Sequence, residues 1–134
     1  MTHMVPLLVV EDEAFVLIDL QNTLEDSGYT VLTATSAQEA FNLLEERLAD
    51  IRGLITDIDI GPGGITGWDV AQRAREARPE LPVVYMTGAS ADQWAARGVP
   101  NSILIPKPFA PAQMITAVSQ LLNSTSHIPT NREQ

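Results

Sequence analysis

The chain has 134 residues, enough for one domain built around a single hydrophobic core. Hydrophobic residues make up 45% of it, which is typical of a globular protein and excludes a disordered one. Acidic residues outnumber basic ones by 17 to 8, a net charge of -9 that argues against a nucleic-acid-binding surface, and the absence of cysteine excludes disulfides and thiolate metal sites.

The N-terminal stretch MTHMVPLLVVEDE lacks the basic region of a secretory signal, and acidic residues interrupt its apolar run. No other run approaches the ~20 apolar residues that a membrane span needs. We therefore expect a cytoplasmic protein with no membrane partner and no direct contact with nucleic acid.

Five apolar runs predict β-strands, at 6–10, 30–34, 53–56, 82–87 and 102–105. Four of these runs are almost continuously apolar, with little alternation between apolar and polar residues. Such runs are typical of parallel strands whose two faces are both covered by helices.

Helical periodicity fills the segments between the strands. We expect a first helix at about 13–26 and a third at about 67–78. The second helix begins with Ser36 and Glu39, which are spaced as a capping box. Its apolar face consists of Ala37, Ala40, Phe41, Leu44 and Leu48.

Two further helices are expected after the fourth and fifth strands. Ser90 and Gln93 are placed to cap a short helix that stops at Gly98. The last helix has Pro111 in its first turn, a position that tolerates proline. Its apolar face consists of Met114, Ile115, Val118, Leu121 and Leu122.

The regular alternation of strand and helix predicts an α/β fold, with a parallel sheet covered by helices on both faces. We expect one domain over residues 1–122. The polar, aperiodic residues 123–134 are expected to form a flexible tail.

Polar side chains that can carry chemistry follow four of the five strands. They are Glu11 and Asp12 after the first strand, Asp57 after the third, Thr87 after the fourth and Lys107 after the fifth. Ligands of open α/β sheets bind beyond the carboxyl ends of the strands. If these four strands are neighbours, the five side chains converge on one rim.

Three carboxylates at one place repel one another, and a hard divalent cation offsets the repulsion. Mg²⁺ is the natural candidate, with Asp57 as a nucleophile toward a phosphoryl group. Lys107 and Thr87 would donate to the phosphoryl oxygens. A single strand-end acid such as Asp12 is more often a helix cap, but the conjunction of all these residues favours the functional interpretation.

The segments VVEDE, LITDIDI, YMTG and PKPF resemble, in this order and spacing, the receiver domain of bacterial two-component response regulators. The resemblance extends from about residue 5 to 122. It implies a doubly wound, flavodoxin-like sheet of five parallel strands in the order 2-1-3-4-5. It also implies a stand-alone switch that a histidine kinase or a histidine phosphotransfer protein phosphorylates with Mg²⁺, and that acts by binding a downstream protein.

Carried over position by position, the resemblance implies that Asp57 is the phosphoacceptor. Glu11 and Asp12 are then the metal-binding acidic pair, and Asp59 offers its main-chain carbonyl to the metal. Thr87 and Lys107 sense the phosphoryl group. The chain would be no enzyme beyond promoting its own phosphorylation and dephosphorylation.

This sequence departs from the family pattern in two places. Leu104 stands three positions before the lysine, where the family often has an aromatic switch residue, and the side chain of Asp59 adds a charge beside the acceptor. The glycine-rich loop 61–67 is also a little longer than usual. We expect the Lys107–Pro108 bond to be cis, as the resemblance implies.

Two other functions fit parts of this sequence less well. Residues 57–61, DIDIG, superficially match the nucleophile of a small haloacid-dehalogenase-like phosphatase, with Asp59 as acid and base. That nucleophile follows a first strand, however, and Glu11 would have no role. A nucleotide-binding phosphate loop is excluded because Trp68, and no lysine, follows Gly67.

Overall fold

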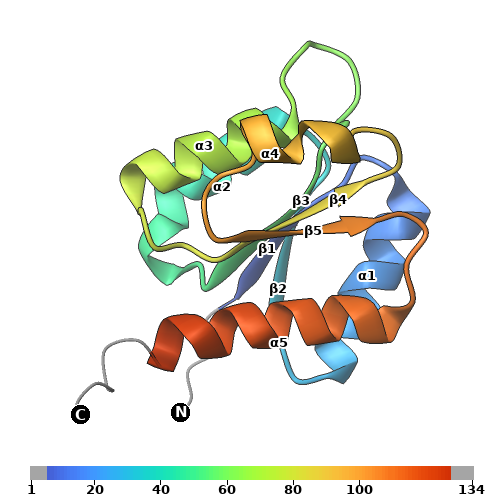
Figure 1. Ribbon diagram of the computed structural model, residues 1–134, viewed down its shortest axis with the longest axis vertical. Helices are drawn as coiled ribbons and strands as arrows, with labels where there is room; N and C mark the ends of the chain where they lie inside the picture. Colours follow the sequence, from blue (N-terminus) through green and yellow to red (C-terminus); the bar gives the residue numbers. More distant parts are fainter. Residues whose placement is uncertain (1–5, 128–134) are drawn as a thin grey trace.

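The computed structural model of the chain describes residues 6–127, with their side chains up to Asn123. Within this range one sheet has five parallel strands in the order β2-β1-β3-β4-β5, as the resemblance implied (Figure 1). The strands are β1 (Leu7–Val10), β2 (Val31–Ala34), β3 (Gly53–Asp57), β4 (Val83–Thr87) and β5 (Ser102–Pro106).

Helices cover both faces of the sheet. They are α1 (Ala14–Asp26), α2 (Ala37–Arg47), α3 (Gly67–Ala77), α4 (Trp94–Arg97) and α5 (Pro111–His127), with short 3-10 turns η1 (Leu48–Asp50) and η2 (Ala91–Gln93). Figure 1 shows α1 and α5 on one face and the other helices on the opposite face. Helix α5 is longer than expected, because it continues past residue 122 to His127; residues 128–134 of the expected tail lie outside the described range.

Alternate side chains of each central strand enter two separate cores. In β1, Leu7 and Val9 pack with α1 and α5, whereas Leu8 and Val10 pack with α2 and α3. All residues of β1, β3 and β4 are buried. This double burial is the physical reason for the continuous apolar runs in the sequence.

The helix N-termini partly differ from the expected caps. Ser36 Oγ accepts from the N–H of Glu39 at 3.1 Å as expected, but the Glu39 carboxylate accepts from the N–H of Thr35 at 2.6 Å and does not close the box on Ser36. A complete capping box is instead formed by Thr66 and Asp69 at the start of α3. Ser90 contributes its main-chain oxygen to the turn of η2, and no side-chain cap.

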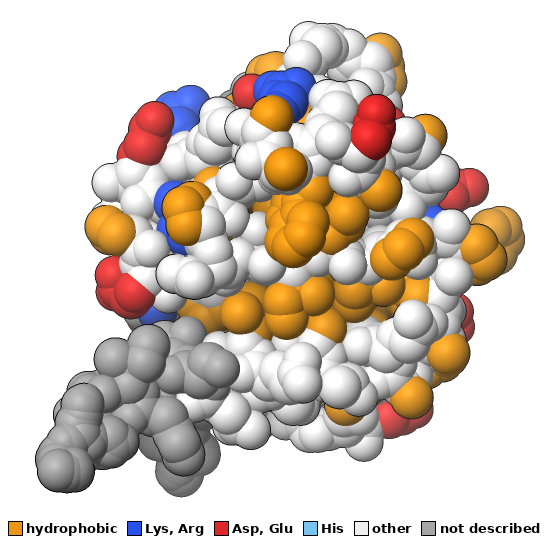
Figure 2. Space-filling model, in the orientation of Figure 1, with side chains coloured by type: hydrophobic (Ala, Val, Ile, Leu, Met, Phe, Trp, Pro, Cys, Tyr) orange, Lys and Arg blue, Asp and Glu red, His pale blue; other side chains and the backbone are white. Residues whose placement is uncertain are grey.

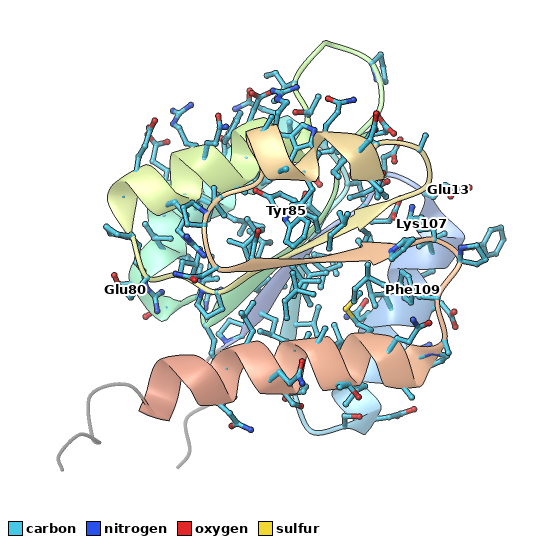
Figure 3. All side chains as sticks on the ribbon, in the orientation of Figure 1. Glu13, Glu80, Tyr85, Lys107 and Phe109 are labelled. Atoms are coloured by element: carbon cyan, nitrogen blue, oxygen red, sulfur yellow. The ribbon has the colours of Figure 1, made fainter. Side chains whose placement is uncertain are left out.

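The turn between α4 and β5 is tied to its neighbours. Tyr85 lies buried in β4, where its hydroxyl accepts from the N–H of Val99 at 3.1 Å and its ring centroid lies 4.7 Å from that of Trp68 (Figure 3). Trp94 is partly exposed, and its indole N–H donates to Ser102 Oγ at 3.0 Å. Trp94 thus is held by a hydrogen bond to β5 and remains accessible to solvent.

Helix α5 carries no Asp, Glu, Lys or Arg over Pro111–His127. Beside it, residues of β5 and α5 line an open groove that includes Ile103, Ile105 and Ala117. Figure 2 shows hydrophobic side chains gathered along this groove. None of the helices in the described range is long and apolar enough to cross a membrane.

Candidate functional site at the carboxyl edge of the sheet

The carboxyl ends of β1, β3, β4 and β5 meet at one edge, because these strands are consecutive in the sheet. Figure 3 shows Lys107 and Glu13 at this edge, at the same end of the molecule. The edge therefore collects the side chains that follow the strands in sequence, as predicted.

Three carboxylates come together there. Glu11, Asp12 and Asp57 each offer an oxygen, and these oxygens lie within 4.8 Å of one another. Glu11 and Asp57 are buried, while Asp12 is exposed. Closely spaced carboxylate oxygens with one side open to water suit Mg²⁺, which binds few protein ligands and retains waters. The residues present therefore fit a divalent cation.

Lys107 joins two of these acids. Its Nζ lies 2.9 Å from Glu11 Oε1 and 3.2 Å from Asp57 Oδ2. Burial alone would lower the pKa of Lys107, but the hydrogen bond to Glu11 and the charges of Asp57 and Glu11 outweigh it, so the pKa is raised. The lysine thus stays protonated and available to an incoming anion. The Lys107–Pro108 bond is cis, as expected.

Glu11 is held by both of its oxygens. Oε1 accepts from Lys107, and Oε2 accepts from the main-chain N–H of Glu13 at 3.0 Å.

Burial raises the pKa of Asp57, the charge of Glu11 raises it further, and Lys107 opposes both, leaving it at about 6 in place of 3.8. The metal-free site is thus a place of unfavourable electrostatics, which a bound cation would relieve.

Thr87 stands on the neighbouring strand. Its Oγ1 accepts from the main-chain N–H groups of Ala89 and Ser90, at 3.2 and 2.7 Å. A hydroxyl has one donor and two acceptor positions, so these two bonds leave the donor proton for another partner. The main-chain oxygen of Thr87 accepts from the N–H of Lys107 at 2.7 Å, which places the two residues side by side.

The backbone beyond Asp57 is fixed by main-chain contacts for which the sequence carries no motif. The N–H of Ile58 donates to Met86 O at 3.1 Å, and Ile58 O accepts from the N–H of Gly67 at 2.8 Å. A β-carbon on Gly67 would lie 2.1 Å from Asp57 O. The glycine that opens α3 is therefore required by the close approach of the helix to the end of β3.

Between β3 and α3 the glycine-rich loop begins beside the acidic cluster and then projects outward from the molecule (Figure 1). Gly61, Gly63 and Gly64 have φ values of 85°, 112° and 77°, in the region that favours glycine. A β-carbon on Gly61 would lie 3.2 Å from Asp12 Oδ2. The side chain of Asp59 is exposed at the start of the loop, away from the buried part of the site.

Comparison with known proteins places these residues in a family context. The family model for the response regulator receiver domain matches residues 7–119. A solved response regulator receiver protein from Sinorhizobium medicae WSM419 is 45% identical, with a TM-score of 0.86 over 92% of this chain and 98% of that one. A solved receiver domain protein from Clostridium thermocellum is 25% identical, with a TM-score of 0.81 over 90% of this chain and 96% of that one.

Among curated proteins, the response regulator SaeR of Staphylococcus aureus is 30% identical over 124 residues. The match covers 91% of this chain and 51% of SaeR, so the chain spans about half the length of that relative. None of these similarities supports the alternative of a haloacid-dehalogenase-like phosphatase.

Proposed function

Because the chain belongs to the response regulator receiver domain family, we propose that it is a phosphorylation switch in which Asp57 accepts the phosphoryl group. The observation that carries this assignment is the bridge from Lys107 to Glu11 and Asp57, inside a cluster of three carboxylates. A cation held between acids at a strand end is suited to bind an anion that arrives at Asp57.

Transfer from a phosphohistidine follows from this arrangement. A carboxylate oxygen of Asp57 forms a bond to phosphorus while the P–N bond to the donor breaks, and the electron pair of that bond stays on the histidine nitrogen. The ammonium of Lys107 stabilises the phosphoryl oxygens as charge shifts. The hydroxyl of Thr87, whose proton is uncommitted in its loop contacts, donates to another of these oxygens.

A Mg²⁺ ion would be held by Asp12 and Asp57 and by the main-chain carbonyl of Asp59, with Glu11 acting mainly through a water. When bound, it would neutralise charge between the acceptor and the phosphoryl oxygens. The full engagement of both Glu11 oxygens with Lys107 and Glu13 supports an indirect role for this residue.

The donor is a histidine kinase or a histidine phosphotransfer protein. Helix α1 begins directly after the acidic pair and presents apolar side chains to solvent, with Phe15 89% and Ile18 54% exposed. Exposed apolar groups beside a reactive site are typical of protein-binding surfaces. We propose that the donor binds there, and that a downstream protein reads the phosphorylated state.

The assignment of Asp57 is tested with acetyl phosphate and Mg²⁺, followed by mass spectrometry of the intact protein. One acid-labile phosphoryl group is expected on the parent protein and none on Asp57→Asn. Asp59→Asn serves as the matched control, because it removes an exposed carboxylate two residues away and should still be phosphorylated. Label that persists in Asp57→Asn and maps to another side chain would refute the assignment.

A further inference from the structure

Four polar or charged side chains are buried in the part of the chain that the structure describes: Glu11, Thr56, Asp57 and Thr87. Three of them belong to the candidate site already described. The fourth, Thr56, precedes Asp57 in β3 and is completely buried. A buried hydroxyl costs free energy unless it forms a hydrogen bond, so its partner is informative.

That partner is the acceptor's own backbone. Thr56 Oγ1 donates to the main-chain oxygen of Asp57 at 2.9 Å. Leu54 and Ile58, two residues before and two residues after Thr56, belong to the apolar core beneath α2 and α3. Tyr85, the neighbour of Thr56 on β4, belongs to the same core. A hydrogen bond in such surroundings is stronger than one exposed to water.

Packing does not explain a threonine at this position. Valine has nearly the same shape, prefers strands equally, and would bury a methyl group without the desolvation cost of a hydroxyl. We propose that the hydroxyl of Thr56 is a positioning group for the phosphorylation of Asp57. This inference rests on the proposed function and adds a residue to it.

The hydroxyl acts on a peptide that is also held from other sides. Asp57 O lies against Gly67, and Ile58 is hydrogen-bonded through its N–H to Met86 and through its oxygen to Gly67. Rotation of the peptide between Asp57 and Ile58 would move the Asp57 carboxylate and the main-chain oxygen of Asp59 together. By holding Asp57 O, Thr56 limits this rotation and keeps the nucleophile aligned.

The test compares three substitutions. Thr56→Val keeps the shape and removes the hydroxyl, Thr56→Ser keeps the hydroxyl and removes the methyl group, and Thr56→Ala removes both. We expect Thr56→Val to be phosphorylated by acetyl phosphate about threefold to tenfold more slowly than the parent, and to be somewhat less stable because Asp57 O loses a buried hydrogen bond. Thr56→Ser should be less stable and yet keep a rate within about twofold of the parent.

Amide exchange in the metal-free protein provides a second measurement. The N–H of Ile58 should exchange faster in Thr56→Val than in Thr56→Ser, because the peptide is less restrained. If Thr56→Val does not fold, the phosphorylation rates of Thr56→Ser and Thr56→Ala provide the test. Thr56→Ser, which keeps the hydroxyl, should then be phosphorylated about threefold to tenfold faster than Thr56→Ala.

Equal phosphorylation rates in the variants with and without the hydroxyl, together with Asp57-dependent labelling of the parent, would overturn this inference alone. A parent protein that takes no label, or takes it equally in Asp57→Asn, would overturn the proposed function and this inference with it.

Discussion

Gly67 lies against the main-chain oxygen of Asp57 so closely that a β-carbon would come within 2.1 Å of that oxygen. Gly67→Ala must therefore displace either the start of α3 or the end of β3. We expect lower stability, by about 1–3 kcal/mol, and slower phosphorylation by acetyl phosphate. Gly88→Ala is the matched control, because nothing lies within 4 Å of a β-carbon there. Parent-like phosphorylation of Gly67→Ala would show that the contact is not needed.

The raised pKa of Asp57 makes the stability of the metal-free protein depend on pH. Between 3.8, the ordinary value, and about 6, the folded protein retains a proton that the unfolded chain has lost. The free energy of unfolding therefore falls as pH rises through this window, and the full cost is present above it. Asp57→Asn removes this cost.

Urea unfolding with a chelator present should then show Asp57→Asn to be more stable than the parent by about 1–3 kcal/mol near neutral pH. The difference should disappear as the pH falls below 3.8. Asp19→Asn on the exposed side of α1 is the control and should show no such pattern. A pH-independent difference would contradict the electrostatic explanation.

Asp12 is expected to be a direct ligand of Mg²⁺, because it is the exposed member of the carboxylate cluster. Asp12→Asn should weaken Mg²⁺ binding by at least about tenfold in titration calorimetry and should abolish most phosphorylation. It should also stabilise the metal-free protein, since one of three repelling charges is removed. Asp19→Asn again provides the control for charge. Unchanged Mg²⁺ affinity in Asp12→Asn would place the cation elsewhere.

Substitution of Phe15 distinguishes the binding of a protein phosphodonor from the chemistry at Asp57. Phe15→Ala should leave phosphorylation by acetyl phosphate unchanged, because the side chain is 89% exposed and contributes little to the fold. Transfer from a phosphorylated histidine kinase or phosphotransfer protein should slow about tenfold or more, if the ring is a central contact. Trp94→Ala, on the far helix, is the comparison. Equal loss with both donors would indicate a structural effect.

The positions of the site residues could be predicted because parallel strands end at a common edge. Glu11, Asp57, Thr87 and Lys107 each lie at the end of an apolar strand run, and topology alone brings them together. The direction of the Thr87 hydroxyl could not be predicted, because it depends on the path of the loop through Ala89 and Ser90. Side-chain contacts with a local backbone turn leave no periodic signal in the sequence.

The helix caps show both outcomes. Thr66 and Asp69 have the spacing of a capping box, so the sequence contains a signal for the start of α3, although it directly follows a glycine-rich loop. At α2 the same rule predicted a reciprocal bond between Glu39 and Ser36, but the carboxylate reaches Thr35, whose N–H and hydroxyl both donate to it. Two donors on one residue outweigh one on its neighbour.

The charge-free helix α5 gives the molecule an uneven electric field. The net charge of -9 arises entirely from other parts of the chain, while Pro111–His127 contributes no Asp, Glu, Lys or Arg. Repulsion between copies in dilute buffer is therefore anisotropic, and it is smaller for encounters in which the α5 sides face each other. Beyond about a Debye length, which is near 10 Å at 0.1 M salt, this bias is screened and fades. The salt dependence of the second virial coefficient should thus differ from that of a protein whose net charge of -9 is spread evenly over its surface.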